Sequence, residues 1–130
     1  MWETAIELWH HAKPPYERTF IHRDFHPGNV LWFRGRLSGV VDWANGCRGP
    51  RGCDLAHCRT NLLGLSGQEA ADRFLAAYEA LTGHTHHPYW ELASVLEHGP
   101  SHWTQAQLVE SEPTLARAVG ALTTLPVRGT

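Results

Sequence analysis

The sequence is poor in lysine and cysteine, and it contains no long apolar run. Basic residues are almost all arginine, and Lys13 is the only lysine. The three cysteines form no Cys-x-x-Cys pair, so buried thiols are the simpler interpretation. No apolar run approaches the length of a membrane span, and the first residues lack the basic and apolar regions of a signal peptide. We therefore expect a cytoplasmic protein that does not enter a membrane.

The charge balance gives no electrostatic reason to expect nucleic acid or an anionic membrane as a partner. The formal net charge is -2, and 42% of the residues are hydrophobic, which is typical of a globular protein with a buried core. A chain of 130 residues is long enough for one domain with a modest core. We therefore expect residues 1–130 to form a single domain.

The chemistry-bearing residues are concentrated in residues 22–29, which contain His22, Asp24 and Asn29. This spacing matches the catalytic-loop pattern His-x-Asp followed by Asn five positions after the Asp. Phosphoryl transfer requires a carboxylate that orients the attacking hydroxyl and oxygen ligands that hold magnesium. The pattern therefore predicts Asp24 as the catalytic base and Asn29 as a metal ligand.

Two strand-like runs follow, residues 29–33 and 37–43, and residues 34–36 between them read as a glycine-containing hairpin loop. If Phe33 lies opposite Leu37, Asn29 comes level with Val41 and next to Asp42, and a bulge at Gly39 would shift this register by one. Either register places an amide oxygen and a carboxylate at the same end of the hairpin. One hard cation such as magnesium could bind both, so Asp42 is the second predicted metal ligand.

With these motifs the chain resembles the aminoglycoside phosphotransferase-like family, which includes choline kinases and shares the protein-kinase fold. The resemblance is carried by residues 22–29, by Val-Val-Asp-Trp at residues 40–43, and by residues 49–50 leading to Cys-Asp-Leu-Ala at residues 53–56. It implies a phosphotransferase that moves the γ-phosphoryl group of ATP or GTP to an alcohol of a small molecule, with magnesium as cofactor. The acceptor itself is not predicted.

The resemblance also assigns roles to individual residues. It implies that Asp24 is the catalytic aspartate, that Asn29 and Asp42 hold magnesium, and that His22 and Asp54 support the site structurally. In this assignment the ring of His22 packs beneath the metal-binding strand, and Asp54 braces the catalytic loop from the start of the next helix. An aspartate at that position would also cap a helix whatever the chemistry.

The chain departs from the family pattern at two places near the site. Arg23 stands where many small-molecule members have glycine, and residues 51–53 replace part of a common Gly-Asp-Pro run. These departures bear on the acceptor more than on the reaction. The resemblance further suggests an acceptor pocket near Trp90 and Trp103.

The nucleotide-binding elements of a kinase-like fold have no counterpart in the given sequence. Such a fold normally uses a lysine on a strand and a glycine-rich loop over the phosphates. Lys13 instead precedes Pro14 and Pro15, and no glycine-rich strand-turn-strand segment comes before it. We therefore expect a partial, C-terminal lobe that lacks the N-terminal nucleotide-binding lobe and is weakly active or inactive alone; a missing N-terminal lobe would be its partner.

The remaining chain predicts helices, giving an α+β and mostly helical fold. A small β-hairpin carries the catalytic site and is backed by about five helices, as in the C-terminal lobe of a kinase-like fold. The predicted helices and the positions that bound them are a first helix up to Pro14, one from Asp54 to about Leu65, one from Ser66 to Gly83, one from Pro88 to Gly99, and one from Pro113. We expect the tail after Pro126 to be irregular.

Two other functions fit the same residues. The first is a non-catalytic binding or regulatory module that retains the kinase-like fold. The second is a metal-dependent hydrolase in which His22, Asp24 and His26 ligate zinc, which requires a second ligand cluster elsewhere in the chain.

Overall fold

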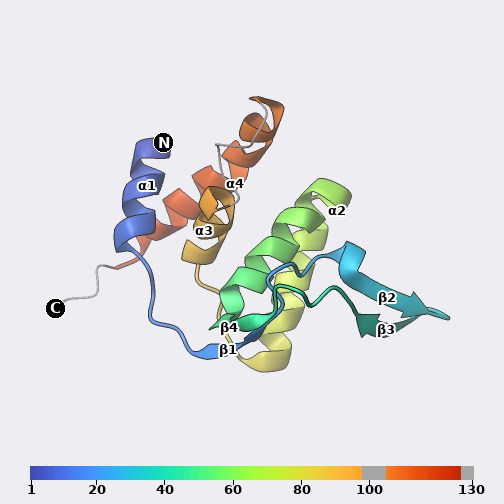
Figure 1. The fold of residues 1–130 in the computed structure, drawn as a ribbon. Helices are drawn as coiled ribbons and strands as arrows, with labels where there is room; N and C mark the ends of the chain where they lie inside the picture. The colour runs from blue at the N-terminus through green and yellow to red at the C-terminus, as the bar shows by residue number, and fades with distance from the viewer. Residues whose placement is uncertain (98–104, 127–130) are drawn as a thin grey trace. The chain divides into compact units, whose positions relative to one another are not determined.

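The computed structural model of the protein describes residues 1–97 and 105–126. The described part is α+β and mostly helical, with four helices and two small two-stranded antiparallel sheets (Figure 1). The predicted fold class is confirmed at this level. The helices are α1 (Trp2–His11), α2 (Arg51–Thr82), α3 (Tyr89–Glu97) and α4 (Gln105–Thr124). The strands are β1 (Arg18–Ile21), β2 (Val30–Phe33), β3 (Arg36–Val40) and β4 (Cys47–Pro50), and a 3-10 turn, η1 (Pro27–Asn29), precedes β2.

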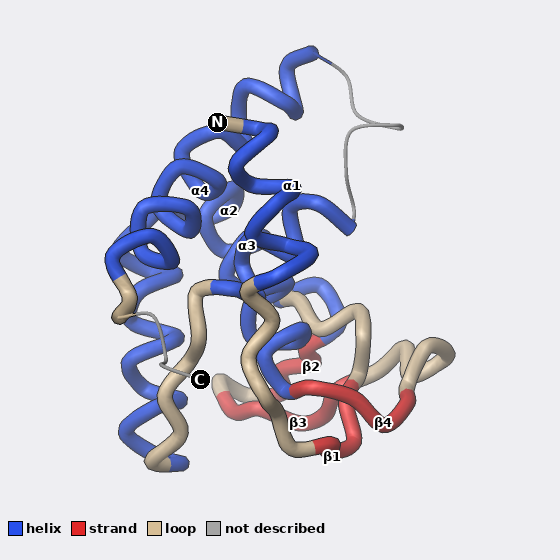
Figure 2. Tube along the Cα trace, turned by 90° about the vertical axis from the view of Figure 1, so that its left-hand side faces the viewer, coloured by secondary structure: helices blue, strands red, loops and turns tan. Residues whose placement is uncertain are grey.

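The chain divides into two compact units. One consists of Met1–Pro15 and His87–Thr130, and the other of Tyr16–His86. Both sheets belong to the second unit, where loops connect them, as the red and tan segments of Figure 2 show. All five predicted site residues also belong to the second unit.

The predicted hairpin is present as β2 and β3, but its turn is shorter than expected. Phe33 pairs with Arg36 rather than with Leu37, so Arg34 and Gly35 alone form the turn. Both have positive φ, 50° and 74°, as in the two-residue turns whose twist matches that of the flanking strands. The predicted pair of Phe33 and Leu37 was therefore wrong by one residue.

A bulge farther along the hairpin shifts the pairing by one residue and so restores the predicted register. Leu31 pairs with Gly39 and Trp32 with Leu37, so the register shifts by one between them. Below the bulge the amide of Val41 donates to the carbonyl oxygen of Asn29 at 2.9 Å. The base of the hairpin thus has the predicted register, with Asn29 level with Val41 and beside Asp42.

The second sheet, formed by β1 and β4, was not predicted. Its antiparallel register pairs Arg18 with Pro50 and Ile21 with Cys47. A Cβ atom at Gly49 would lie 2.7 Å from Cδ1 of Ile21, so a larger residue there would have to displace the end of that side chain. Because β1 leads into residues 22–29 and β4 leads into α2, this sheet brings the loop to the first turn of that helix.

The two helices predicted from Asp54 and from Ser66 form one element, α2, with a break at Gly67. The backbone of Gly67 is non-helical, with φ 83° and ψ 179°, and the element ends at Gly83 in the left-handed conformation. The N-cap is Pro50, so Asp54 lies inside the first turn and does not cap the helix. The capping interpretation of Asp54 was therefore wrong.

The core of the Tyr16–His86 unit is built mainly on α2. Leu55, Cys58 and Ala71 are buried, as their helical spacing predicts. Helical spacing also places Leu65 on the stripe of Leu55 and Cys58, and Leu81 on the stripe of Ala71. Both are exposed, because Leu65 lies just before the break at Gly67 and Leu81 lies in the final turn of the helix. The break and the helix end thus limit the length over which the stripe is buried.

The other unit packs α1, α3 and α4. The hydroxyl of Tyr89 in α3 donates to the carbonyl oxygen of Trp9 in α1 at 3.0 Å. Helix α4 begins at Gln105, so Pro113 lies inside it, and the predicted start at Pro113 was wrong. A proline within a helix removes one backbone hydrogen bond but need not begin the helix. The helical spacing of Leu115, Val119 and Leu122 predicts one buried stripe, which is largely confirmed, since Leu115 and Leu122 are buried.

Three sequence predictions fall outside the described residues. They are the helix end at residues 99–100, the pocket residue Trp103 and the irregular tail after Pro126. Within the described residues, no helix combines the length and the apolar composition that crossing a membrane requires.

The two glycines around the break in α2 offer a matched test of its geometry. Both positions are exposed with open space around them, but Gly64 is helical and Gly67 is not. We expect Gly64→Ala to raise the free energy of unfolding by about 0.5–1 kcal/mol, because alanine loses less backbone entropy on folding. Gly67→Ala should lower it by about 1–3 kcal/mol, because its backbone conformation is accessible almost only to glycine. Urea unfolding followed by circular dichroism measures both, and equal effects would contradict the break.

Candidate active site

The loop of residues 22–29 is attached to α2 through one carboxylate. Oδ2 of Asp54 accepts a hydrogen bond from the backbone amide of His22 at 2.7 Å, and Oδ1 accepts one from the amide of Arg23 at 2.8 Å. The φ of Arg23 is 72°, a left-handed conformation that favours glycine. The bond to Asp54 offsets part of the cost of placing arginine there, and this backbone conformation explains why glycine suits the position in the resembling family.

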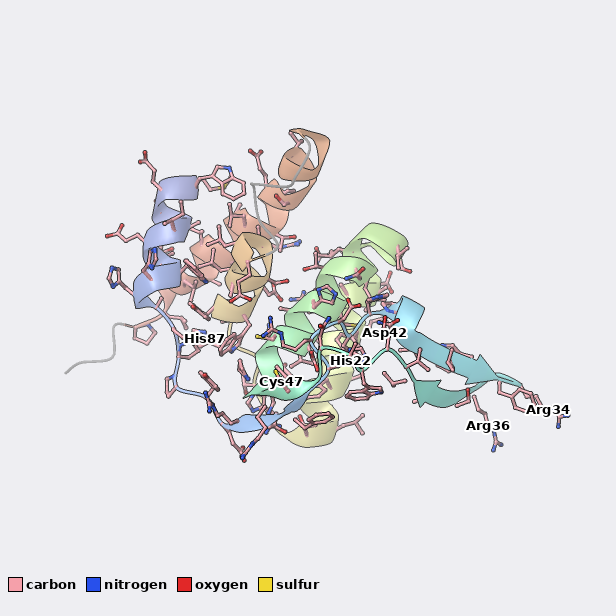
Figure 3. All side chains as sticks on the ribbon, viewed as in Figure 1. His22, Arg34, Arg36, Asp42, Cys47 and His87 are labelled. Atoms are coloured by element: carbon pink, nitrogen blue, oxygen red, sulfur yellow. The ribbon has the colours of Figure 1, made fainter. Side chains whose placement is uncertain are left out.

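His22 connects the loop to the end of the hairpin. Its side chain is buried, and its Nδ1 accepts a hydrogen bond from the amide of Asp24 at 3.2 Å. Since a backbone amide can only donate, the proton of the neutral ring lies on Nε2, which donates to the carbonyl oxygen of Val41 at 2.7 Å. The centre of the His22 ring also lies 4.4 Å from the centre of the Trp43 ring. Figure 3 shows His22 where the loop meets the base of the hairpin, near Asp42.

The side chain of Asn29 is buried and its amide nitrogen is engaged. Nδ2 donates to the backbone carbonyl oxygen of Asp24 at 2.9 Å and lies 3.4 Å from Oδ2 of the same residue. Within the described residues no hydrogen bond reaches Oδ1 of Asn29. The two contacts of the nitrogen fix the orientation of the amide and leave its oxygen as an acceptor.

Asp42 lies at the base of the hairpin, directly after Val41. Its side chain is exposed, and among the described residues it has no hydrogen bond or ion pair. Its φ is 64°, which is uncommon for a residue other than glycine. Val41 is held on both sides, because its amide donates to Asn29 and its carbonyl accepts from His22. The backbone before Asp42 is therefore anchored, and the carboxylate of Asp42 is accessible to a bound ion or molecule.

The carboxylate of Asp24 lies among two histidines and Asn29. Oδ1 is 3.1 Å from Nε2 of His57 and 3.6 Å from Nε2 of His26, and Oδ2 faces Asn29. The side chain of Asp24 is 37% exposed, so a bound molecule could reach it. The structure thus brings Asp24, Asn29 and His22 into one connected network, with Asp42 beside it.

His57 is the residue of this network that sequence reasoning missed. It comes from α2, three residues after Asp54. Residues three apart lie on the same face of a helix, so the position of Asp54 at the helix start was the available signal. Without knowledge of the β1 and β4 pairing, nothing indicated that this face meets the loop.

The zinc hydrolase hypothesis finds no support in the described residues. They contain no group of three or more His, Cys, Asp or Glu side chains arranged to hold a metal ion. Both ring nitrogens of His22 already bond to backbone groups, so the residue offers no nitrogen to a metal. His26, another residue of the hypothetical zinc site, uses its Nδ1 to accept a hydrogen bond from the amide of Gly28 at 3.0 Å.

Comparison with protein families agrees with the motif and its geometry. The sequence model of the phosphotransferase enzyme family (APH) matches residues 1–92. The chain belongs to this family. No match was found among curated proteins or among solved structures.

The family match covers all the residues described above as the candidate site. The resemblance stated from residues 22–29, 40–43 and 53–56 is therefore confirmed. The roles of His22, Asp24, Asn29, Asp42 and Asp54 within this family member stay predictions.

A buried thiol beside the site allows a test of the packing of α2. Burial, and secondarily the nearby Asp54 carboxylate, raise the pKa of the Cys58 thiol from 9.0 to about 11. At pH 8 the thiolate fraction should be about 100-fold lower than for an ordinary thiol. A thiolate of higher pKa is more nucleophilic, so we expect alkylation by iodoacetamide to be slowed by about 10-fold or more. Mass spectrometry after digestion compares Cys58 with the half-buried Cys47, and equal rates would contradict the burial of Cys58.

The same shift gives a pH dependence. Between pH 9.0 and about 11 the unfolded thiol is ionised while the folded one keeps its proton, so this group makes the free energy of unfolding fall as the pH rises. A Cys58→Ala variant provides the reference for this slope.

A second test concerns the attachment of the loop. In Asp54→Asn one carboxylate oxygen becomes an NH2 group, which cannot accept from a backbone amide. Loss of one such bond costs about 2 kcal/mol, so we expect the amides of His22 and Arg23 to exchange hydrogen about 30-fold faster. Hydrogen exchange followed by NMR measures this. Glu69→Gln, which removes a charge from an exposed position of α2, should leave both rates unchanged. Unchanged exchange in Asp54→Asn would show that these bonds do not hold the loop.

Proposed function

We propose that the protein transfers the γ-phosphoryl group of ATP or GTP to a hydroxyl group of a small molecule, with magnesium as cofactor. One observation carries the proposal: the accessible carboxylate of Asp24 lies on a loop that Asp54 holds through the amides of His22 and Arg23 and that Asn29 holds through its Nδ2. Asp42 follows Val41, whose amide bonds to the carbonyl oxygen of Asn29. Membership of the phosphotransferase enzyme family supports the same reaction.

The donor set fits magnesium. Magnesium prefers oxygen ligands and is commonly held by one or two carboxylates together with substrate phosphates. Asn29 and Asp42 would supply such oxygens, and neither oxygen is used by another described residue. When bound, the ion would neutralise charge on the nucleotide phosphates.

In the proposed reaction the acceptor hydroxyl donates a hydrogen bond to the carboxylate of Asp24. Its oxygen attacks the γ-phosphorus, a new oxygen–phosphorus bond forms, and the bond from that phosphorus to the bridging oxygen breaks as the nucleoside diphosphate leaves. The hydroxyl proton passes to Asp24. Because such a reaction depends mainly on positioning, the rigid attachment of the loop through Asp54 and His22 is the main contribution of the fold.

We further propose that the chain corresponds to the C-terminal lobe of a kinase-like fold, and that a separate lobe supplies further contacts to the nucleotide. Lys13, the only lysine, lies in the loop between α1 and β1 rather than on a strand, and its Nζ is 6.0 Å from the centre of the Trp90 ring. It therefore does not match the lysine that kinase-like folds carry on a strand over the phosphates. Activity is therefore best measured on the natural protein, with every segment that accompanies residues 1–130.

Substitution of Asp24 tests the reaction. Asp24→Asn removes the base while keeping the size of the side chain, so we expect turnover to fall by about 10²- to 10⁴-fold, the range of general-base contributions. Binding of magnesium and nucleotide should be nearly unchanged, because Asp24 is not a proposed ligand of either. Transfer of ³²P from labelled ATP to a panel of alcohols that includes choline, homoserine and an aminoglycoside measures turnover, and calorimetry measures binding.

Asp72→Asn is the matched control. Asp72 lies on α2, where it accepts from Arg59 at 2.6 Å, and asparagine retains an oxygen for that bond. Equal losses of binding and turnover in Asp24→Asn would show that the role assigned to Asp24 is wrong. Nucleotide binding without transfer to any acceptor, even with the complementary lobe present, would favour a non-catalytic binding module.

A further inference from the structure

We infer that His57 is a positioning residue for the phosphoryl transfer, an inference that rests on the proposed function. Its Nε2 lies 3.1 Å from Oδ1 of Asp24, the carboxylate proposed to accept the hydroxyl proton. An ionised carboxylate can only accept hydrogen bonds, so Nε2 of His57 is the donor. His57 thus holds one oxygen of the base.

The position of His57 on α2 ties the base to the same helix that holds the loop. Asp54 fixes the backbone of the loop through the amides of His22 and Arg23. One turn later on the same face, His57 fixes the side chain of Asp24. Both restraints come from one rigid element, so the carboxylate and its loop keep a constant relative geometry. The ring of His57 is 18% exposed, and its packing limits its own rotation.

The contact also decides which oxygen of Asp24 meets the acceptor. Oδ1 is engaged by His57, whereas among the described residues Oδ2 has only the long 3.4 Å contact with Asn29. Oδ2 is therefore the oxygen available to an incoming hydroxyl. Without His57 the carboxylate could rotate about its Cβ–Cγ bond, and the hydroxyl would lose its alignment with the phosphorus.

His26 does not provide the same restraint. Its Nε2 is 3.6 Å from Oδ1 of Asp24, beyond hydrogen-bond distance, and its ring is held by the amide of Gly28 instead. It adds a second imidazole beside the carboxylate but does not orient it. The orienting contact is therefore assigned to His57.

The test compares His57→Ala, His57→Gln and a control in the natural protein. We expect His57→Ala to lower kcat by about 10- to 100-fold while KM for the nucleotide stays within about twofold, because only alignment of the base is lost. The side-chain amide of glutamine can donate to Asp24, so His57→Gln should recover much of this loss. His84→Ala, which changes an exposed histidine just after α2, should have wild-type kinetics.

The possible outcomes separate this inference from the proposed function. Normal kcat in a folded His57→Ala would overturn the role of His57 alone, as would an equal loss in His57→Gln. Absence of transfer by the wild-type protein would overturn the proposed function, and the role of His57 with it.

A second measurement covers the case in which His57→Ala does not fold. Side-chain ¹⁵N spectra at pH 8 compare the wild-type protein with Asp24→Asn. The Nε2 resonance of His57 should shift while that of His84 does not. An unshifted His57 resonance would show that the contact is absent in solution, which would also overturn the inference.

Discussion

The geometry of the site depends on the pair of hydrogen bonds from the loop backbone to Asp54. A carboxylate that accepts from two successive amides fixes the direction of the chain at that point, here through His22 and Arg23. The same pair stabilises the left-handed backbone of Arg23, the residue directly before Asp24. Two further contacts complete the frame of the site, from His22 to Val41 and from Asn29 to Asp24.

Three aspartates of one site are thereby placed in three different environments. Each oxygen of Asp54 accepts from one backbone amide, one oxygen of Asp24 is engaged by an imidazole, and the carboxylate of Asp42 has no partner among the described residues. The same functional group is thus a structural anchor at Asp54, the proposed base at Asp24 and a proposed metal ligand at Asp42. Their neighbours, rather than their chemistry, distinguish the three roles.

Sequence reasoning succeeded where spacing alone decides the structure. The loop motif, the hairpin and the helix stripes were predicted because turn residues and apolar periodicity are local signals. The β1 and β4 pairing was missed, because residues 47–50 contain arginine, glycine and proline and carry little strand propensity. His57 was missed for the same reason, since its contact with Asp24 depends on that pairing. The helical residues before Pro113 were missed because proline is usually a signal for a helix start.

The hairpin between Asn29 and Asp42 shows how such a site can tolerate changes in chain length. Its two-residue turn and its bulge have opposite effects on register, and together they leave Val30 opposite Val40. Each feature alone would displace Val41 by one position and turn Asp42 to the opposite face of the strand. Insertions and deletions in this hairpin are thus coupled: during divergence, a residue gained or lost at the tip is compatible with the site only when the bulge changes with it.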